Sequence, residues 1–239
     1  MKILGVSGSL RNARYGRGSD LLINEIEPLE SNEALIDYLE TQTKIRVDDF
    51  LEAGRADSRP FDELYAQLQK SRGEKGLSNS EASLVAGLWA AFKEGADIEH
   101  TGLSRFFPMN GKPKHLDELK AIILDADALL ISGPVYFGDR GSLVQSFVEF
   151  ISTDEDIKEH VKGRVYAGIA VGAKRNGGQE TLLVYQIIDM CNLNMIAVGN
   201  SAETTSQYGG TVLAGDVGTA WSDEYGLNTS IGTGQRLAR

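Results

Sequence analysis

Short apolar runs alternate with amphipathic segments along this 239-residue chain. The apolar runs predict buried strands at residues 3–6, 97–103, 128–132, 165–171 and 195–198. Apolar residues at helical spacing predict helices at 80–93, 116–124, 143–151 and 181–193. Because strands that alternate with helices pair in parallel through crossover connections, we expect an α/β fold with one parallel sheet covered on both faces. Five such strands suit the order 2-1-3-4-5.

Residues 13–77 interrupt this rhythm. A strand-to-helix loop usually has two to six residues, whereas about 65 residues separate the first strand from its helix here. The segment has helical patterns at 20–26, 32–39, 46–53 and 61–70, and 14 acidic against 9 basic residues. We therefore expect one domain, residues 1–239, with a largely helical insertion that forms a lid or a subunit contact, or is a peripheral decoration. Leu64, Tyr65 and Leu68 lie at helical spacing and are interpreted as core.

The composition narrows the function classes. The formal net charge of −10 argues against nucleic acid and anionic membrane surfaces as partners. A single cysteine, Cys191, excludes an internal disulfide and a cysteine-ligated iron-sulfur cluster within one chain. The sequence contains no apolar run of membrane-spanning length and no secretory leader pattern, so we expect a cytoplasmic protein.

Three glycine-rich loops each follow a predicted strand, at residues 8–12, 133–138 and 172–180. Loops at the carboxyl ends of parallel strands converge on one crevice, so the three loops predict one shared site. The first loop, with Ser9, Arg11 and Asn12, and the helix opening at residues 78–80 offer hydroxyl groups, a positive charge and backbone N–H donors suited to a phosphate. The alternative for Ser78, Asn79 and Ser80 is simple helix capping. Neither a P-loop nor a dinucleotide fingerprint is present, so a phosphomonoester is the predicted ligand group.

The other two loops suggest a planar ligand. Residues 134–138 place a proline and two aromatic side chains at a tight turn, which suits contact with a heterocycle; the alternative is that the aromatics are core plugs. Glycines in the third loop permit close backbone approach. Its Lys174 and Arg175 either attract an anionic nucleotide or are merely solvated.

These segments, GSLRN (8–12), SNS (78–80), PVYFG (134–138) and RNGGQE (175–180), resemble those of the NADPH-dependent FMN reductase family. The resemblance is closer to its branch of iron-sulfur flavoproteins and multimeric flavodoxins, and covers residues 1–12 and 78–239. It implies a flavodoxin-like three-layer sandwich, noncovalent FMN, and a homodimer or homotetramer. The implied phosphate-binding residues are Ser9, Arg11, Asn12, Ser78, Asn79 and Ser80. The implied residues around the flavin ring and ribityl chain are Pro134, Val135, Tyr136, Phe137 and Gly138, with Gly172, Asn176, Gly177 and Gly178 at the other ring edge.

The chain departs from that branch in two places. Residues 103–112 lack the compact cysteine motif that follows the second strand there, so no cluster is expected. The insertion splits the phosphate loop, which affects the roles of Arg11 and Asn12.

The resemblance implies an oxidoreductase that transfers hydride from NADH or NADPH to FMN and passes electrons to a small acceptor, such as a quinone or free flavin. The alternatives are a flavodoxin-like electron carrier that serves a protein partner, and a phosphosugar or nucleotide module without flavin. A flavin enzyme needs no general base, and His100, His115 and His160 are interpreted as structural. After residue 210 we expect an irregular segment and a short terminal helix, with residues 223–225 near a neighbouring subunit's flavin.

Overall fold

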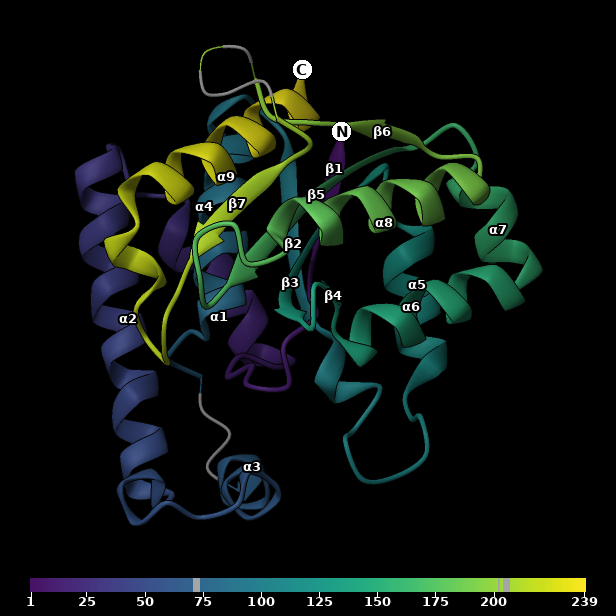
Figure 1. Ribbon diagram of the computed structural model, residues 1–239. Helices are drawn as coiled ribbons and strands as arrows, with labels where there is room; N and C mark the ends of the chain where they lie inside the picture. The colour runs from purple at the N-terminus through teal and green to yellow at the C-terminus, as the bar shows by residue number, and fades with distance from the viewer. Residues whose placement is uncertain (71–73, 202, 204–206) are drawn as a thin grey trace.

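The computed structural model describes residues 1–70, 74–201, 203 and 207–239. Its central sheet contains β1 (Lys2–Ser7), β2 (Asp97–Gly102), β3 (Ala128–Tyr136), β5 (Val165–Gly172) and β6 (Ile196–Val198) (Figure 1). These strands pair in parallel in the order β2-β1-β3-β5-β6. This is the 2-1-3-4-5 order predicted from the five apolar runs, and it confirms the parallel α/β fold.

Two further short strands extend the sheet in the described part of the chain. β4 (Asp139–Arg140) folds back antiparallel on the end of β3, and β7 (Gly210–Leu213) runs parallel to β5. β6 pairs with residues 165–167 of β5 and β7 with residues 169–172, so two short strands share the last position of the sheet. The expectation of an irregular segment after residue 210 was wrong for β7. A run of only four residues that begins with glycine carries too little apolar pattern to be recognised.

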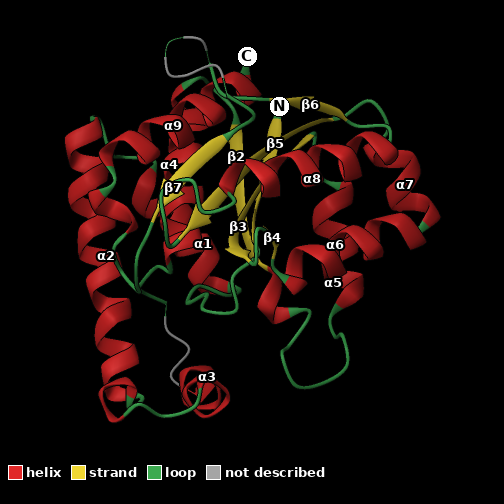
Figure 2. Cartoon of the chain, viewed as in Figure 1, coloured by secondary structure: helices red, strands yellow, loops and turns green. Residues whose placement is uncertain are grey.

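Helices cover both faces of the sheet, which gives three layers (Figure 2). One face packs against α1 (Arg17–Ile26), α4 (Asn79–Lys93) and α9 (Glu224–Ala238). The other packs against α5 (Leu116–Leu124), α6 (Ser142–Thr153), α7 (Glu155–Val161) and α8 (Gln179–Asn192). The side chains of β1 alternate between the two cores, Ile3 to the first and Leu4 and Val6 to the second, as a strand buried on both faces requires.

The terminal helix α9 has fifteen residues, longer than the short helix expected. Glycines within it made it read as broken, because glycine in a helix interior is unfavourable by about 1 kcal/mol relative to alanine. Its Gly234 lies against α4: a Cβ there would come within 1.9 Å of the Gly87 carbonyl oxygen. The glycine therefore allows the two helices to approach closely.

The segment 13–77 contains α1, α2 (Asn32–Glu52), the 3-10 turn η1 (Arg55–Asp57) and α3 (Phe61–Lys70). The patterns at 32–39 and 46–53 belong to one continuous helix, α2, which extends down one side of the molecule with α3 near its lower end (Figure 1). Leu64 and Leu68 of α3 pack on Phe50 of α2, as expected for core positions.

Arg14 organises the base of this segment. Its guanidinium is fully buried and donates to the Gly18 and Gly76 carbonyls and to the side chains of Glu25 (2.7 Å), Tyr38 and Gln42. A buried charge is tolerated only when it is paired and fully hydrogen-bonded, and these contacts meet that need. One side chain therefore links α1, α2 and the exit of the segment.

Candidate functional site

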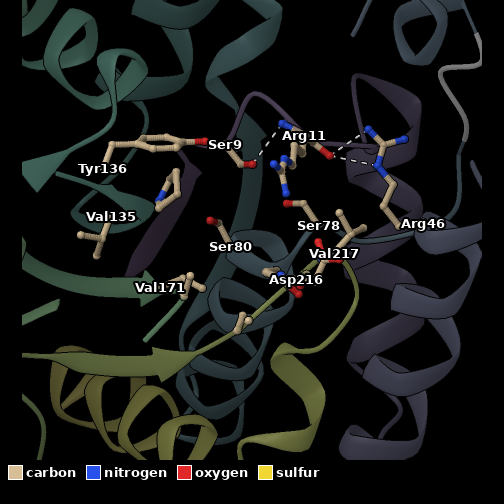
Figure 3. Close-up of a pocket in the computed structure, with 15 residues that line it drawn as sticks. Ser9, Arg11, Arg46, Ser78, Ser80, Val135, Tyr136, Val171, Asp216 and Val217 are labelled. Atoms are coloured by element: carbon tan, nitrogen blue, oxygen red, sulfur yellow. Dashed lines mark hydrogen bonds between the residues drawn. The ribbon is translucent and has the colours of Figure 1, made fainter. Parts of the chain in front are cut away.

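An open cleft with a volume of about 200 Å³ lies at the carboxyl ends of β1, β3 and β5 (Figure 3). Segments from distant parts of the sequence form its walls. The lining residues are Ser9, Arg11, Arg46, Ser78, Asn79, Ser80, Pro134, Val135, Tyr136, Val171, Ala173, Ala214, Gly215, Asp216 and Val217. Eight of the fifteen predicted site residues are among them.

The loop after β1 enters the cleft directly from the sheet. The Gly8 N–H donates to the Ser132 carbonyl of β3 at 2.7 Å, and the buried Ser9 hydroxyl accepts the Arg11 N–H at 3.0 Å. Asn12 does not line the cleft: its side chain is buried beneath the loop, where it accepts from the Ser7 hydroxyl and donates to the Ser7 carbonyl. In the structure Asn12 shapes the loop from below.

The Arg11 side chain lines the cleft, and none of the described carboxylates pairs with it. Its guanidinium lies 5.7 Å from the centre of the Phe50 ring and 5.5 Å from that of Phe61. Within the described residues no carboxylate forms an ion pair with it, and its buried Nε has no acceptor. Because a buried donor without an acceptor is costly, this guanidinium is suited to receive an anion.

The amino terminus of α4 forms the neighbouring wall. Ser78 caps the helix by accepting the Glu81 N–H, and the Glu81 carboxylate accepts the Ser78 N–H in return. The next two backbone N–H groups, of Asn79 and Ser80, have no partner in the part of the chain that the structure describes. Free N–H groups at a helix start, with the positive end of its dipole, favour a bound anion.

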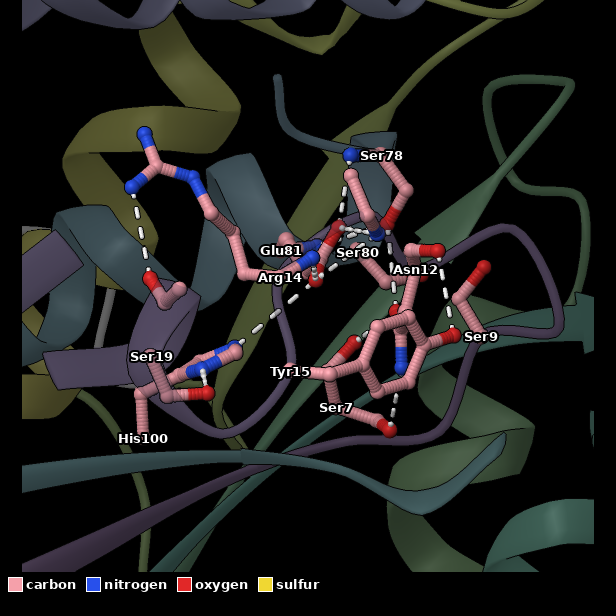
Figure 4. Close-up of polar contacts among 12 residues, drawn as sticks. Ser7, Ser9, Asn12, Arg14, Tyr15, Ser19, Ser78, Ser80, Glu81 and His100 are labelled. Atoms are coloured by element: carbon pink, nitrogen blue, oxygen red, sulfur yellow. Dashed lines mark hydrogen bonds and ion pairs between the residues drawn. The ribbon is translucent and has the colours of Figure 1, made fainter. Parts of the chain in front are cut away.

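The same Glu81 carboxylate is fully buried and accepts the N–H groups of Ala13 and Arg14 as well (Figure 4). Burial raises its pKa, while the bonded N–H groups and Arg46 act in the opposite direction. Residues 13–14 begin the insertion and Ser78 follows its end, so one carboxylate holds both ends of the insertion against α4.

The Asn79 side chain and the Ser80 carbonyl form hydrogen bonds within the protein. The Asn79 side chain donates to the Asp216 carbonyl and accepts the N–H groups of Thr219 and Ala220, each at 3.0 Å. The Ser80 carbonyl accepts the Ser132 hydroxyl at 2.9 Å. Both residues line the cleft. The Asn79 amide fixes the opposite wall, whereas the Ser80 hydroxyl and both backbone N–H groups form no hydrogen bond with the described residues.

Only the first part of the second predicted loop lines the cleft. Pro134, Val135 and Tyr136 line the cleft, and Tyr136 is 44% exposed at its rim. Phe137 is fully exposed, with a left-handed backbone, and lies outside the cleft lining, as does Gly138. The aromatic residues are therefore not core plugs.

The third predicted loop does not line the cleft with any of its four named positions. A Cβ on Gly178 would lie 2.7 Å from the Gly138 Cα, and one on Gly172 would lie 2.6 Å from the Gln179 side chain. These glycines serve packing within and between loops. Gly177 donates its N–H to Gln179, and Asn176 lines a separate depression with Arg175, Gln179, Glu180, Gln207, Thr211, Leu213, Asp223 and Tyr225.

Sequence reasoning missed the wall contributed by α2 and the wall after β7. Arg46 comes from the insertion, and its position in a helical pattern gave no signal. Residues 214–217 follow a strand end, so recognising β7 would have placed them by the rule used for the other loops. Val171 and Ala173, at the end of β5, flank Gly172, which was predicted as a site residue but does not itself line the cleft.

The histidines lie outside the cleft lining. His100 is fully buried, and burial together with nearby Arg14 lowers its pKa to about 3. His160 pairs with the Ala126 carbonyl at 2.8 Å. Among the described residues no group of three or more His, Cys, Asp or Glu could hold a metal ion, and none of the helices has the length and apolarity that a bilayer crossing needs.

The strand order and the cleft define a class: an α/β protein whose cleft has an arginine and a helix start at one end and Tyr136 at its open rim. A family model described as NADPH-dependent FMN reductase matches residues 74–208, more than half of the chain. The chain belongs to that family, as its motifs predicted, and is a flavoprotein with FMN as its cofactor.

Individual relatives agree with this assignment. An iron-sulfur flavoprotein of Methanocaldococcus jannaschii is 31% identical over 123 residues, which cover 52% of this chain and 63% of the relative. One from Archaeoglobus fulgidus is 26% identical over 117 residues, covering 47% of this chain and 58% of the relative. The chain thus spans about three fifths of the length of these curated relatives.

A solved flavone reductase shares the architecture. It aligns with all of this chain and 62% of its own, with a TM-score of 0.53 and 14% identity. At that identity the likeness concerns the fold alone. Together with the observed strand order it confirms the flavodoxin-like fold.

Proposed function

We propose that this chain is an NAD(P)H-dependent FMN oxidoreductase that passes electrons to a small acceptor, such as a quinone or free flavin. The observation that carries the proposal is the unpaired Arg11 guanidinium in a cleft that also presents free N–H groups of α4. The family assignment supports the same cofactor.

The residues at this end of the cleft suit a phosphate monoester. Ser9 offers a hydroxyl, Asn79 and Ser80 offer N–H donors, and Arg11 offers an uncompensated charge. The other nearby arginines are already paired, Arg46 with Asp49 at 3.0 Å and Arg55 with Asp216. Among these arginines, Arg11 alone is left without an ion pair in the described part of the chain, so its charge and the positive end of the α4 dipole are available to an anionic ligand.

The remaining lining is suited to a ring system. Pro134, Val135, Val171 and Ala214 give apolar surface, and Tyr136 adds an aromatic face at the open rim. Such surface excludes water and packs against a planar heterocycle. The open rim leaves access for a second molecule, either the nicotinamide or the acceptor.

FMN would supply the redox chemistry here, since the flavin ring accepts a hydride and releases electrons to an acceptor. The residues of this chain would bind the flavin, orient its ring and shield it from water. The only carboxylate of the cleft lining, Asp216, is held by Arg55. The cleft residues therefore act by position rather than by proton transfer.

The test is an absorbance spectrum of the purified chain with FMN, followed by anaerobic addition of NADPH and then NADH. We expect the oxidised flavin bands to bleach with at least one nucleotide, and to return when a quinone is added. Free FMN at the same concentration is the control for bleaching that does not need the protein.

The other outcomes separate the alternatives. A bound flavin that stays oxidised with both nucleotides would favour an electron carrier that serves a protein partner. A chain that takes up no FMN would contradict the flavin site itself. We also propose a cytoplasmic location, in keeping with a sequence whose single cysteine, Cys191, can form no disulfide within one chain. Cell fractionation tests it.

A further inference from the structure

The insertion reaches back to the loop after β1 through one side chain. Arg46, in the middle of α2, is only 2% exposed. Its Nε and Nη2 donate to the Arg11 carbonyl at 3.0 and 2.8 Å (Figure 3). Nη2 also donates to the Asn12 carbonyl at 2.9 Å. Nη1 donates to Asp49 at 3.0 Å, one turn along the same helix, and this ion pair holds the guanidinium in place.

These contacts fix the orientation of two consecutive peptide groups. The peptide bonds are trans, so a carbonyl turned toward Arg46 turns the following N–H away from it. The N–H that follows the Asn12 carbonyl belongs to Ala13, and the Glu81 carboxylate accepts it at 3.1 Å. The loop is thus held from one side by Arg46 and from the other by Glu81.

The same helix also supports the Arg11 side chain. Phe50, four residues after Arg46, is fully buried, and its ring lies beneath the guanidinium of Arg11. α2 therefore contacts both the backbone and the side chain of Arg11. On the opposite wall, a Cβ on Gly218 would meet the Val47 side chain at 2.3 Å, so α2 also packs closely on the loop after β7.

Arg14 shows what a purely structural arginine looks like in the same segment. It is equally buried, but its partners all lie within the insertion or at its exit. Arg46 instead donates three of its four hydrogen bonds to backbone carbonyls of the loop after β1. The two arginines therefore have separate roles.

We infer that the insertion is part of the phosphate end of the cleft and that Arg46 is a positioning residue, which presets the loop at Arg11 and Asn12 for the phosphate group of the flavin. The inference rests on the proposed placement of FMN in this cleft. Four of the five guanidinium N–H groups of Arg46 already donate to carbonyl and carboxylate oxygens, so we assign it a role that acts through the loop.

The test compares FMN with riboflavin, which has the same ring system and ribityl chain without the phosphate. Equilibrium dialysis of the full-length, flavin-depleted chain gives Kd for both ligands. For Arg46→Ala we expect the Kd of FMN to rise about 10- to 100-fold, because hydrogen bonds from a charged donor to the loop are lost. The Kd of riboflavin should change less than about threefold, since that ligand lacks the group that the loop positions.

Two further variants complete the design. Arg46→Lys keeps the charge but loses the planar fork that spans two carbonyls, so we expect a smaller loss of FMN affinity, about 3- to 10-fold. Lys44→Ala removes an exposed positive charge from the same helix without contacting the loop, and should leave both Kd values unchanged.

The outcomes are distinguishable. A wild-type chain with no preference for FMN over riboflavin would contradict the proposed site itself. A preference that survives in Arg46→Ala would overturn only the role of Arg46. If Arg46→Ala does not fold, Arg46→Lys takes its place, and the measured quantity is the ratio of the Kd of riboflavin to that of FMN. A ratio unchanged from wild type overturns the inference.

Discussion

His100 lies fully buried on β2, with charged groups on one side and a hydroxyl on the other. Its Nδ1 pairs with the Ser19 hydroxyl at 3.0 Å, while Nε2 faces Glu81 at 3.9 Å (Figure 4). Burial and the nearby Arg14 lower its pKa from 6.5 to about 3. The folded chain therefore keeps this imidazole neutral at pH values where the unfolded chain protonates it.

This difference predicts an acid-dependent loss of stability. Between pH 6.5 and about 3, His100 is protonated in the unfolded state and neutral in the folded state. The stability that neutral His100 contributes is therefore fully present above pH 6.5 and is lost as the pH falls through this range. At pH 5 the expected loss is about 2 kcal/mol relative to pH 7. Denaturant unfolding of wild type and His100→Asn at both pH values measures it, and the variant should lose less.

Because Glu81 also makes the stability depend on pH, the effect of His100 is measured as the difference between wild type and His100→Asn. The pKa of Glu81 is raised, so its own contribution has the opposite sign and declines as the pH rises. Both chains carry Glu81, which largely removes its effect from the difference. His115→Asn, at an exposed position with positive φ that suits asparagine, is the control. Equal losses in wild type and His100→Asn would contradict the prediction.

At the scale of single residues, the sequence predicted which side chains lie near the cleft better than what each side chain does. Ser9, Arg11 and Tyr136 line the cleft. Asn12 and Asn79 were chosen as polar groups in the right loops, but their amides are bonded to the protein's own backbone. A polar side chain in a ligand loop and one that shapes the loop have the same sequence signature.

At the scale of elements, the start of α4 serves both the fold and the cleft. The Ser78 cap accepts the Glu81 N–H at 3.2 Å, and its hydroxyl also donates to the Asn12 side chain at 3.4 Å. The cap of α2 is simpler: the Ser31 hydroxyl accepts the Ala34 N–H at 3.2 Å, far along the helix from Arg46. The two serines form a matched pair.

We expect Ser78→Ala and Ser31→Ala each to lower the free energy of unfolding by about 1 kcal/mol, the usual cost of losing a cap. Only Ser78→Ala should also weaken FMN binding, because its cap supports the loop and the helix end beside the cleft. Denaturant unfolding and FMN titration measure the two effects. An equal loss of FMN affinity in both variants would contradict the assignment of α4 to the phosphate end.

Elements with long apolar patterns were predictable. The strands at the centre of the sheet and the helices α4, α5, α6 and α8 follow from apolar periodicity. β7 was missed because it is short, and α2 was read as two helices because its middle is polar. Which part of the insertion touches the cleft depends on the path of the chain in space, and local pattern does not encode that path.

At the scale of the whole molecule, exposed aromatic side chains gather at the rim of the cleft. Phe137 is fully exposed at the turn between β3 and β4, and the neighbouring Tyr136 is about half exposed. Neighbouring exposed apolar side chains can form a patch of the kind that marks a protein contact site. We therefore propose a homodimer or homotetramer in which this rim lies at a subunit contact.

Sedimentation velocity tests this proposal, and the expected mass is that of two or four chains. Phe137→Asn removes the ring at a positive φ that asparagine accepts, and should shift the equilibrium toward smaller species. Leu51→Asn makes the matched change at an exposed position of α2. Dissociation by Leu51→Asn alone would move the contact to the insertion, and a monomeric wild type would contradict the proposal.

The paired ends of the insertion have a consequence for the history of this fold. Residues 13–14 and 78 meet on the single carboxylate of Glu81, so the insertion begins after β1 and ends at the start of α4 at nearly the same point. A segment whose ends already touch can lengthen, shorten or be exchanged with little cost in loop closure. Descendants of one ancestral sheet can thus acquire different appendages at this junction while their strands keep the same register.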